Sequence, residues 1–140
     1  MGDNAAIPTI LESATVRFGD LSVAEKMLLE TTANACEADC DGLSAQDRLI
    51  RGEVFSWMCT SGETGTKPTQ RGVYIAHAVL TGKVDLSWAQ LGFPIVAVDC
   101  VFRDPIILTY TRASYLRLSK SSIGQLTANR AVFDDCIVLD

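Results

Sequence analysis

The chain has 140 residues, 48% hydrophobic and 21% charged, a composition that excludes an intrinsically disordered protein. Its net charge is −5, and residues 1–71 carry all of it, since basic and acidic side chains balance in residues 72–140. Neither half has the basic footprint of a nucleic-acid-binding protein, and no apolar run reaches the roughly 18 residues of a membrane span. Residues 1–10 lack the basic and apolar regions of a secretory signal. We therefore expect a cytoplasmic protein that binds neither nucleic acid nor membrane.

The cysteines indicate free thiols rather than disulfides or a metal site. There are five, an odd number, and no Cys-x-x-Cys pair occurs, which is typical of a protein from a reducing compartment. Cys36 and Cys40 have the spacing of half a zinc site, but no second pair lies near them in the sequence. We predict no bound metal and no cofactor.

The N-terminal segment, residues 1–71, is predicted to contain two helices. Residues 1–20 show no clear period and are expected to form a loop. Ser22 and Glu25 have the spacing of a capping box, which predicts a helix over about 22–37.

A second start signal follows at Ser44, with Asp47 three residues later. The apolar residues after it recur at helical spacing, which predicts a helix over about 45–59. Residues 60–70 are rich in Thr and Gly and are predicted to form a loop. The apolar stripe that we expect to cap the following segment consists of Ile50, Val54, Trp57 and Met58.

Residues 72–140 carry a short repeat. Three-residue segments with small or apolar first and third positions return every five or six residues, with exceptions at Thr111 and Ser121. The step is too short for a hairpin meander and has the wrong spacing for an amphipathic helix, so it favours a solenoid. Segments that begin with a small residue alternate with segments that begin with a larger one. The segments start at residues 78, 84, 89, 95, 100, 106, 111, 116, 121, 126, 131 and 137.

These segments resemble the pentapeptide-repeat family, in which a small residue stands two places before a Leu or Phe and both side chains point inward. Residues 50–60 and 71–123 are similar to an actinobacterial-type branch of that family, which begins with a helix and a loop. The chain departs from the strict repeat in its six-residue steps. The pairs that fit the family unit are Ala78/Leu80, Ala89/Leu91, Cys100/Phe102, Ser121/Ile123 and Ala131/Phe133.

The resemblance implies a mainly β fold with an α-helical N-terminal cap. Residues 72–140 would form a right-handed, four-sided parallel β-helix of about three coils. Members of this branch are often labelled membrane-associated oxidoreductases. We expect no such activity here, because no Gly-x-Gly-x-x-Gly motif follows a strand.

No catalytic constellation is recognisable in the sequence. His77 is the only histidine, and no nucleophile motif accompanies it, so we expect its side chain to point outward at a corner. Residues 62–67 lack the spacing of a phosphate-binding loop. We expect a non-catalytic scaffold or binding module rather than an enzyme. The alternative, an acidic mimic of nucleic acid that acts on a DNA-binding enzyme, is less favoured because residues 72–140 have no net charge.

Three residues are candidates for partner contact. Trp88 lies between Leu86 and Ala89, where its side chain should point outward. Ile137 and Leu139 belong to the last coil, whose far side would be uncovered unless the protein is longer or this end meets a partner. We expect either a protein partner or self-association of two copies through the last coil.

Overall fold

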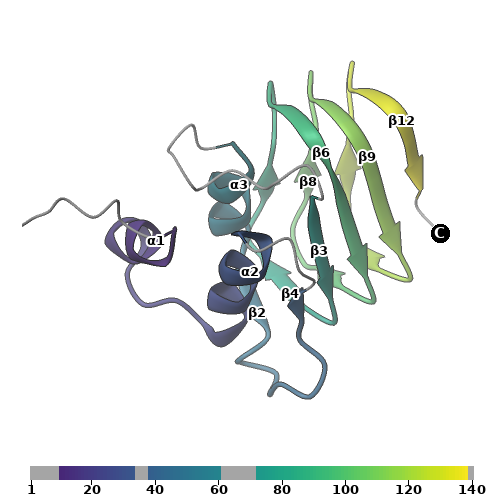
Figure 1. The fold of residues 1–140 in the computed structure, drawn as a ribbon. Coiled ribbons are helices and arrows are strands. Elements are labelled where there is room, and N and C mark those ends of the chain that lie inside the picture. Colours follow the sequence, from purple (N-terminus) through teal and green to yellow (C-terminus); the bar gives the residue numbers. More distant parts are fainter. Residues whose placement is uncertain (1–9, 34–37, 61–71, 139–140) are drawn as a thin grey trace, which may run out of the picture.

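The computed structural model describes residues 10–33, 38–60 and 72–138, which form three helices and twelve strands (Figure 1). The helices are α1 (Ile10–Phe18), α2 (Val23–Ala33) and α3 (Gly52–Thr60). The strands are β1 (Ala38–Asp39), β2 (Leu49–Arg51), β3 (Val73–Ala76), β4 (Val79–Thr81), β5 (Val84–Asp85), β6 (Gln90–Val98), β7 (Val101–Phe102), β8 (Ile106–Ile107), β9 (Arg112–Ser119), β10 (Ser122–Ile123), β11 (Leu126–Thr127) and β12 (Val132–Val138). None of the described helices is both long enough and apolar enough to cross a membrane.

The strands pair in parallel within three sheets. Their orders are β1-β3-β6-β9-β12, β2-β4-β7-β10 and β5-β8-β11. From β3 onward each residue lies beside one that is 20–22 positions further along, as Val79 beside Val101 and Ile106 beside Leu126. We call each such stretch of chain a circuit. A circuit contains four of the repeat segments, so the short period of the sequence appears in the structure as short parallel strands, as predicted.

The long strands are a departure from the expected pattern. The repeat consists of three-residue segments, yet β6, β9 and β12 have nine, eight and seven residues. The pairing of β6 with β9 shifts register between Leu91 and Pro94, and that of β12 with β9 shifts between Phe133 and Cys136. Each long strand therefore consists of two short segments joined at a register shift, and the strand continues through the corner between them.

The repeat positions face the interior. Large side chains at the third position of six segments are buried: Leu80, Leu86, Leu91, Phe102, Leu108 and Leu118. Ile123 and Phe133 are only half-buried, because β10 and the start of β12 lie in the last described circuit. The interior is thus filled by the first and third residues of the segments, and its packing weakens toward β12.

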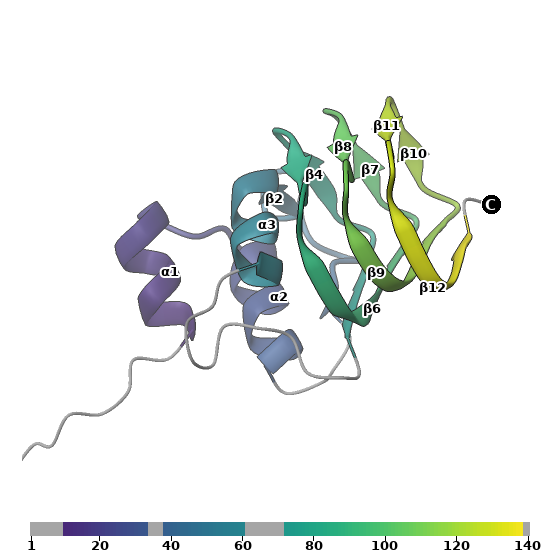
Figure 2. The ribbon, with the colours of Figure 1, turned by 90° about the horizontal axis from the view of Figure 1, so that it is seen from above.

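The N-terminal segment covers the first edge of each sheet. Figure 2 shows the three helices gathered at one end of the stack of strands, with β12 at the other. β1 and β2 extend two of the sheets by pairing with β3 and β4. The third sheet begins at β5, and there α3 takes the place of a strand: the Ser56 hydroxyl oxygen accepts a hydrogen bond from the Asp85 amide at 3.1 Å. An edge strand would otherwise leave such donors unpaired.

The first predicted helix begins where expected. The Ser22 amide donates to a carboxylate oxygen of Glu25 at 2.9 Å, and the Glu25 amide donates to the Ser22 hydroxyl at 3.0 Å, which is a complete capping box. The helix is described to Ala33, and residues 34–37 lie outside the described part of the chain.

The second predicted helix, 45–59, is wrong in its first half. The Ser44 hydroxyl does accept a hydrogen bond from the Asp47 amide, but it starts only a single turn. The chain then extends as β2, because pairing with β4 outweighs the local helical signal, and α3 begins at Gly52. The four residues of the predicted stripe are nevertheless buried, with Ile50 on β2 and Val54, Trp57 and Met58 on α3.

The loop expected over residues 1–20 is also wrong in part, since Ile10–Phe18 is a helix. Ile10, Ala14 and Phe18 stand four residues apart on α1, and Ala14 is fully buried, while Val16 is 89% exposed. The Phe18 ring meets the Trp57 ring edge-on at 5.6 Å between centroids, and the Phe18 carbonyl accepts a hydrogen bond from Arg51. These contacts fix α1 against the rest of the molecule.

Candidate functional site

In the described part of the chain, six residues other than glycine have a left-handed backbone, and they occur at a regular interval. Each directly precedes a repeat segment that begins with a small residue. They form two groups at two corners of successive circuits. The first group, which we call the histidine column, is His77, Asp99 and Lys120, with φ of 60°, 53° and 52°; the second, the aromatic column, is Trp88, Tyr110 and Arg130, with φ of 65°, 55° and 57°.

A tight turn imposes this conformation on the aromatic column. The Leu86 carbonyl accepts a hydrogen bond from the Ala89 amide at 3.1 Å, which places Trp88 third in a four-residue turn. The Trp88 amide donates to Thr109 of the next circuit at 3.0 Å. A left-handed backbone disfavours any residue with a Cβ, by about 1–2 kcal/mol, and bulky aromatic residues adopt it rarely.

The aromatic column is a stack of exposed side chains. The rings of Trp88 and Tyr110 are nearly parallel, 13° apart, with centroids separated by 4.2 Å. The Arg130 guanidinium carbon lies 5.7 Å from the Tyr110 centroid, within the range of a cation–π contact. Trp88 is 72% exposed and Tyr110 is 42% exposed. The predicted outward position of Trp88 is therefore confirmed.

A hollow of about 630 Å³ lies between Trp88 and the C-terminal end of α3. It is bounded by the end of α3 at Cys59 and Thr60 and by the residues around the turn, Asp85, Ser87, Trp88, Ala89 and Gln90. Trp88 borders this hollow, whereas Tyr110, its stacking partner, does not. Hydrogen bonds from the side chain and amide of Ser87 lower the pKa of Asp85 below its ordinary value, so that its carboxyl is ionised at neutral pH.

The histidine column joins the N-terminal segment to the circuits. Nδ1 of His77 lies 2.9 Å from a carboxylate oxygen of Asp39 on β1, and Nε2 lies 3.7 Å from Asp99. The hydrogen bond to Asp39 is the main cause of a raised pKa of His77. The predicted outward position of His77 is confirmed. Within the described ranges no three His, Cys, Asp or Glu side chains are grouped so that they could hold a metal ion.

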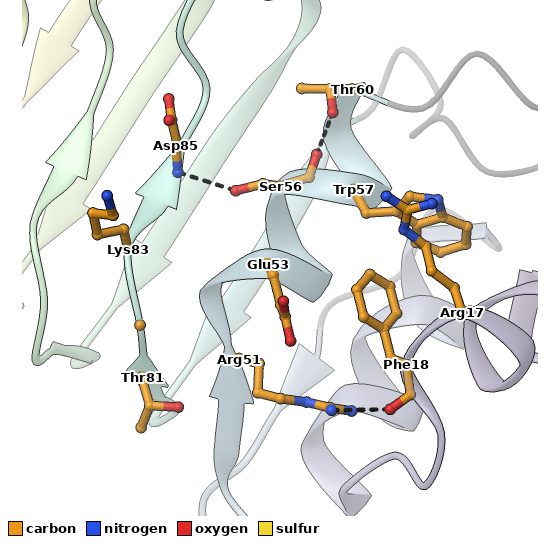
Figure 3. A pocket seen from close by; sticks show the side chains of 11 residues that line it. Arg17, Phe18, Arg51, Glu53, Ser56, Trp57, Thr60, Thr81, Lys83 and Asp85 are labelled. Carbon is orange, nitrogen blue, oxygen red and sulfur yellow. Dashed lines mark hydrogen bonds between the residues drawn. The ribbon is translucent and has the colours of Figure 1, made fainter.

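A second cleft, of about 680 Å³, lies between α1, α3 and the β4–β5 connection (Figure 3). Its central cation, Arg51, is already engaged, since it donates to the Phe18 and Asp20 carbonyls and to Glu25. Both Arg17 and Arg51 lie within 6 Å of the Phe18 ring centroid, at 5.6 and 5.7 Å. These contacts hold α1 against the strands. We therefore interpret the cleft as a packing boundary between elements rather than as a binding site.

Among the sequence-predicted contact residues, only Trp88 belongs to this site. Ile137 lies on β12 beside Leu116, far along the stack, and Leu139 lies outside the described residues. Tyr110 and Arg130 were missed, although each stands immediately before a small-residue segment, as Trp88 does. Cys40, Cys59 and Cys100 are buried free thiols, while Cys36 falls outside the description.

Comparison of the chain with models of known protein families, with curated proteins and with solved structures gives no match.

Proposed function

We propose that the chain is a non-catalytic binding module of the pentapeptide-repeat kind, which holds a protein partner through its aromatic column. In this proposal residues 72–138 are a right-handed, four-sided parallel β-helix of about three coils. The circuits of 20–22 residues support it, as do the register shifts that divide the long strands into two segments. Three buried free thiols fit a module that works in the cytoplasm, as the cysteine count also suggests.

The observation that carries the proposal is the exposure of Trp88 and Tyr110 in left-handed turns. Both features oppose stability, since the backbone conformation costs free energy and the rings remain largely in water. Residues in such conformations cluster at functional sites, where the surrounding structure holds them. Exposed Trp, Tyr and Arg are also the residues that most often dominate the energy of a protein interface. A role in binding would explain why exposed aromatic residues occupy left-handed turns that do not stabilise the fold.

Site-specific crosslinking in cells of the source organism tests this function. A photoreactive phenylalanine analogue at Asn129, next to Arg130 and exposed, should trap a protein partner. The same analogue at Ser122, exposed on β10 away from the column, is the matched control and should trap none.

A second variant separates binding from folding. Glycine adopts the left-handed backbone without strain, so Trp88→Gly with Tyr110→Gly should keep the thermal midpoint within a few degrees while removing the stack. In this variant the adduct at Asn129 should disappear. An adduct that survives the double substitution, or that forms equally at Ser122, would contradict a binding role for the column.

A further inference from the structure

The contacts within the aromatic column indicate what kind of group could stack at its Trp88 end. Tyr110 has the Trp88 ring on one side and the Arg130 guanidinium within cation–π distance. Successive circuits place these three side chains in the order Trp88, Tyr110, Arg130. Among the described residues, the only ring contact of Trp88 is with Tyr110. A further planar group could therefore stack on the indole from the hollow beside α3.

The charge around the hollow favours a cation. Asp85 is exposed, borders the hollow and is ionised at neutral pH. Among the residues that the structure describes, the other side chains that line the hollow are neutral: Cys59, Thr60, Ser87, Trp88, Ala89 and Gln90. The chain as a whole carries −5, which attracts basic partners over long range. A cation on the indole face would gain from the ring quadrupole and from the carboxylate together.

We propose that this hollow takes the guanidinium group of an arginine side chain from the partner protein, stacked on Trp88 and paired with Asp85. This inference rests on the proposed function and names the chemistry that the column recognises. Arginine fits better than lysine, because a planar, weakly hydrated guanidinium stacks on an aromatic face and presents paired donors to a carboxylate. Gln90 and Thr60 add polar groups at the rim of the same hollow.

A titration of the full chain with N-acetyl-arginine methylamide tests the proposal. The chain has two tryptophans, and the indole N–H signals of Trp88 and of buried Trp57 are separable in a proton–nitrogen correlation spectrum, with Trp88→Phe as the assignment. The ligand should shift the Trp88 signal in a saturable way and leave the Trp57 signal in place. The shift should weaken as salt is added.

Matched controls isolate each contact. The citrulline derivative has the same planar shape without charge, and it should bind at least about fivefold more weakly. Asp85→Asn should weaken arginine binding about three- to tenfold. Asp99→Asn removes one charge at the other column and should leave binding unchanged. Equal binding of citrulline, no effect of Asp85→Asn, an equal shift caused by a neutral sugar, or no shift at all would overturn the proposal.

The two proposals fail separately. A protein adduct at Asn129 combined with no arginine-specific shift of Trp88 would leave the binding function standing and remove the arginine chemistry. The absence of a partner adduct would count against the binding function itself, whatever the small ligand does.

Discussion

Glu25 and Arg51 form the principal polar link between α2 and the strands. Oxygens of the buried Glu25 carboxylate accept hydrogen bonds from Arg51 Nε at 2.9 Å, Nη2 at 3.1 Å and the backbone amide at 2.9 Å. The same carboxylate closes the capping box with Ser22. One side chain thus caps the N-terminus of α2 and anchors β2, which pairs with β4.

Glu25→Gln should lower the free energy of unfolding by about 1–3 kcal/mol, because it weakens four charge-assisted hydrogen bonds at once. Burial raises the pKa of Glu25, but the hydrogen bonds from Arg51 and Ser22 lower it by more, so the pKa lies below 4.5. The contribution is therefore complete above pH 4.5 and is lost as the pH falls through the lowered value. Denaturant titrations at pH 7 and pH 3 should show the difference from wild type shrink at acid pH, whereas exposed Asp47→Asn should change little at either pH.

His77 should titrate above its ordinary pKa of 6.5, mainly because of its hydrogen bond to Asp39, with Asp41 and Asp99 adding to the effect. A raised pKa in the folded state stabilises the fold below pH 6.5, and this contribution is lost as the pH rises through the raised value. As the only histidine, His77 gives a single imidazole signal in a proton NMR titration. Asp39→Asn should move its pKa downward, and a pKa at or below 6.5 in the wild type would contradict the described contact.

Phe102→Ala should cost about 3–5 kcal/mol, because the ring is 5% exposed and its removal leaves a cavity inside the circuits. Phe133 also occupies the third position of its segment, six segments further along the chain, but is only half-buried, so Phe133→Ala should cost less than about 2 kcal/mol. Denaturant titration of both variants makes the comparison. Equal costs would mean that the last described circuit is packed as tightly as the middle one.

Gly52→Ala should destabilise the protein by about 1–3 kcal/mol. A Cβ at Gly52 would lie 2.2 Å from the Lys83 carbonyl oxygen and 2.6 Å from that of Gly82, and backbone atoms cannot move aside cheaply. Gly92→Ala is the control, because a Cβ there meets nothing within 4 Å. Thermal unfolding of the two variants should therefore diverge. A Gly52→Ala midpoint equal to that of Gly92→Ala would indicate that α3 lies further from the β4–β5 connection.

Local sequence signals predicted the elements whose stability is itself local. The Ser22–Glu25 capping box predicted the start of α2, and the alternation of small and large residues predicted the inward positions from Ala78 onward. The helix-capping signal at Ser44 produced a single turn, because Leu49–Arg51 pairs with β4 as a parallel strand instead of continuing as a helix. α1 was missed, although Ile10, Ala14 and Phe18 stand at helical spacing; the contact of Phe18 with Trp57 arises only in the folded structure.

Of the three residues in the aromatic column, only Trp88 was predicted from the sequence. An outward Trp88 followed from its place between two inward side chains, which is a property of a single segment. Its stacking on Tyr110 depends on the length of the circuit, which sets residues 22 positions apart side by side. The left-handed backbone at the six corner residues could not be predicted, because none of these residues is a glycine.

The constant separation of paired residues has a consequence for folding order. Parallel sheets usually form slowly, because their partners are distant in sequence. Here each strand from β3 onward closes a loop of only 20–22 residues, so pairing can spread from one circuit to the next at small entropic cost. β1 and β2 must span 37 and 30 residues to reach β3 and β4. We therefore expect β1 and β2 to dock on β3 and β4 after the circuits have begun to pair with one another.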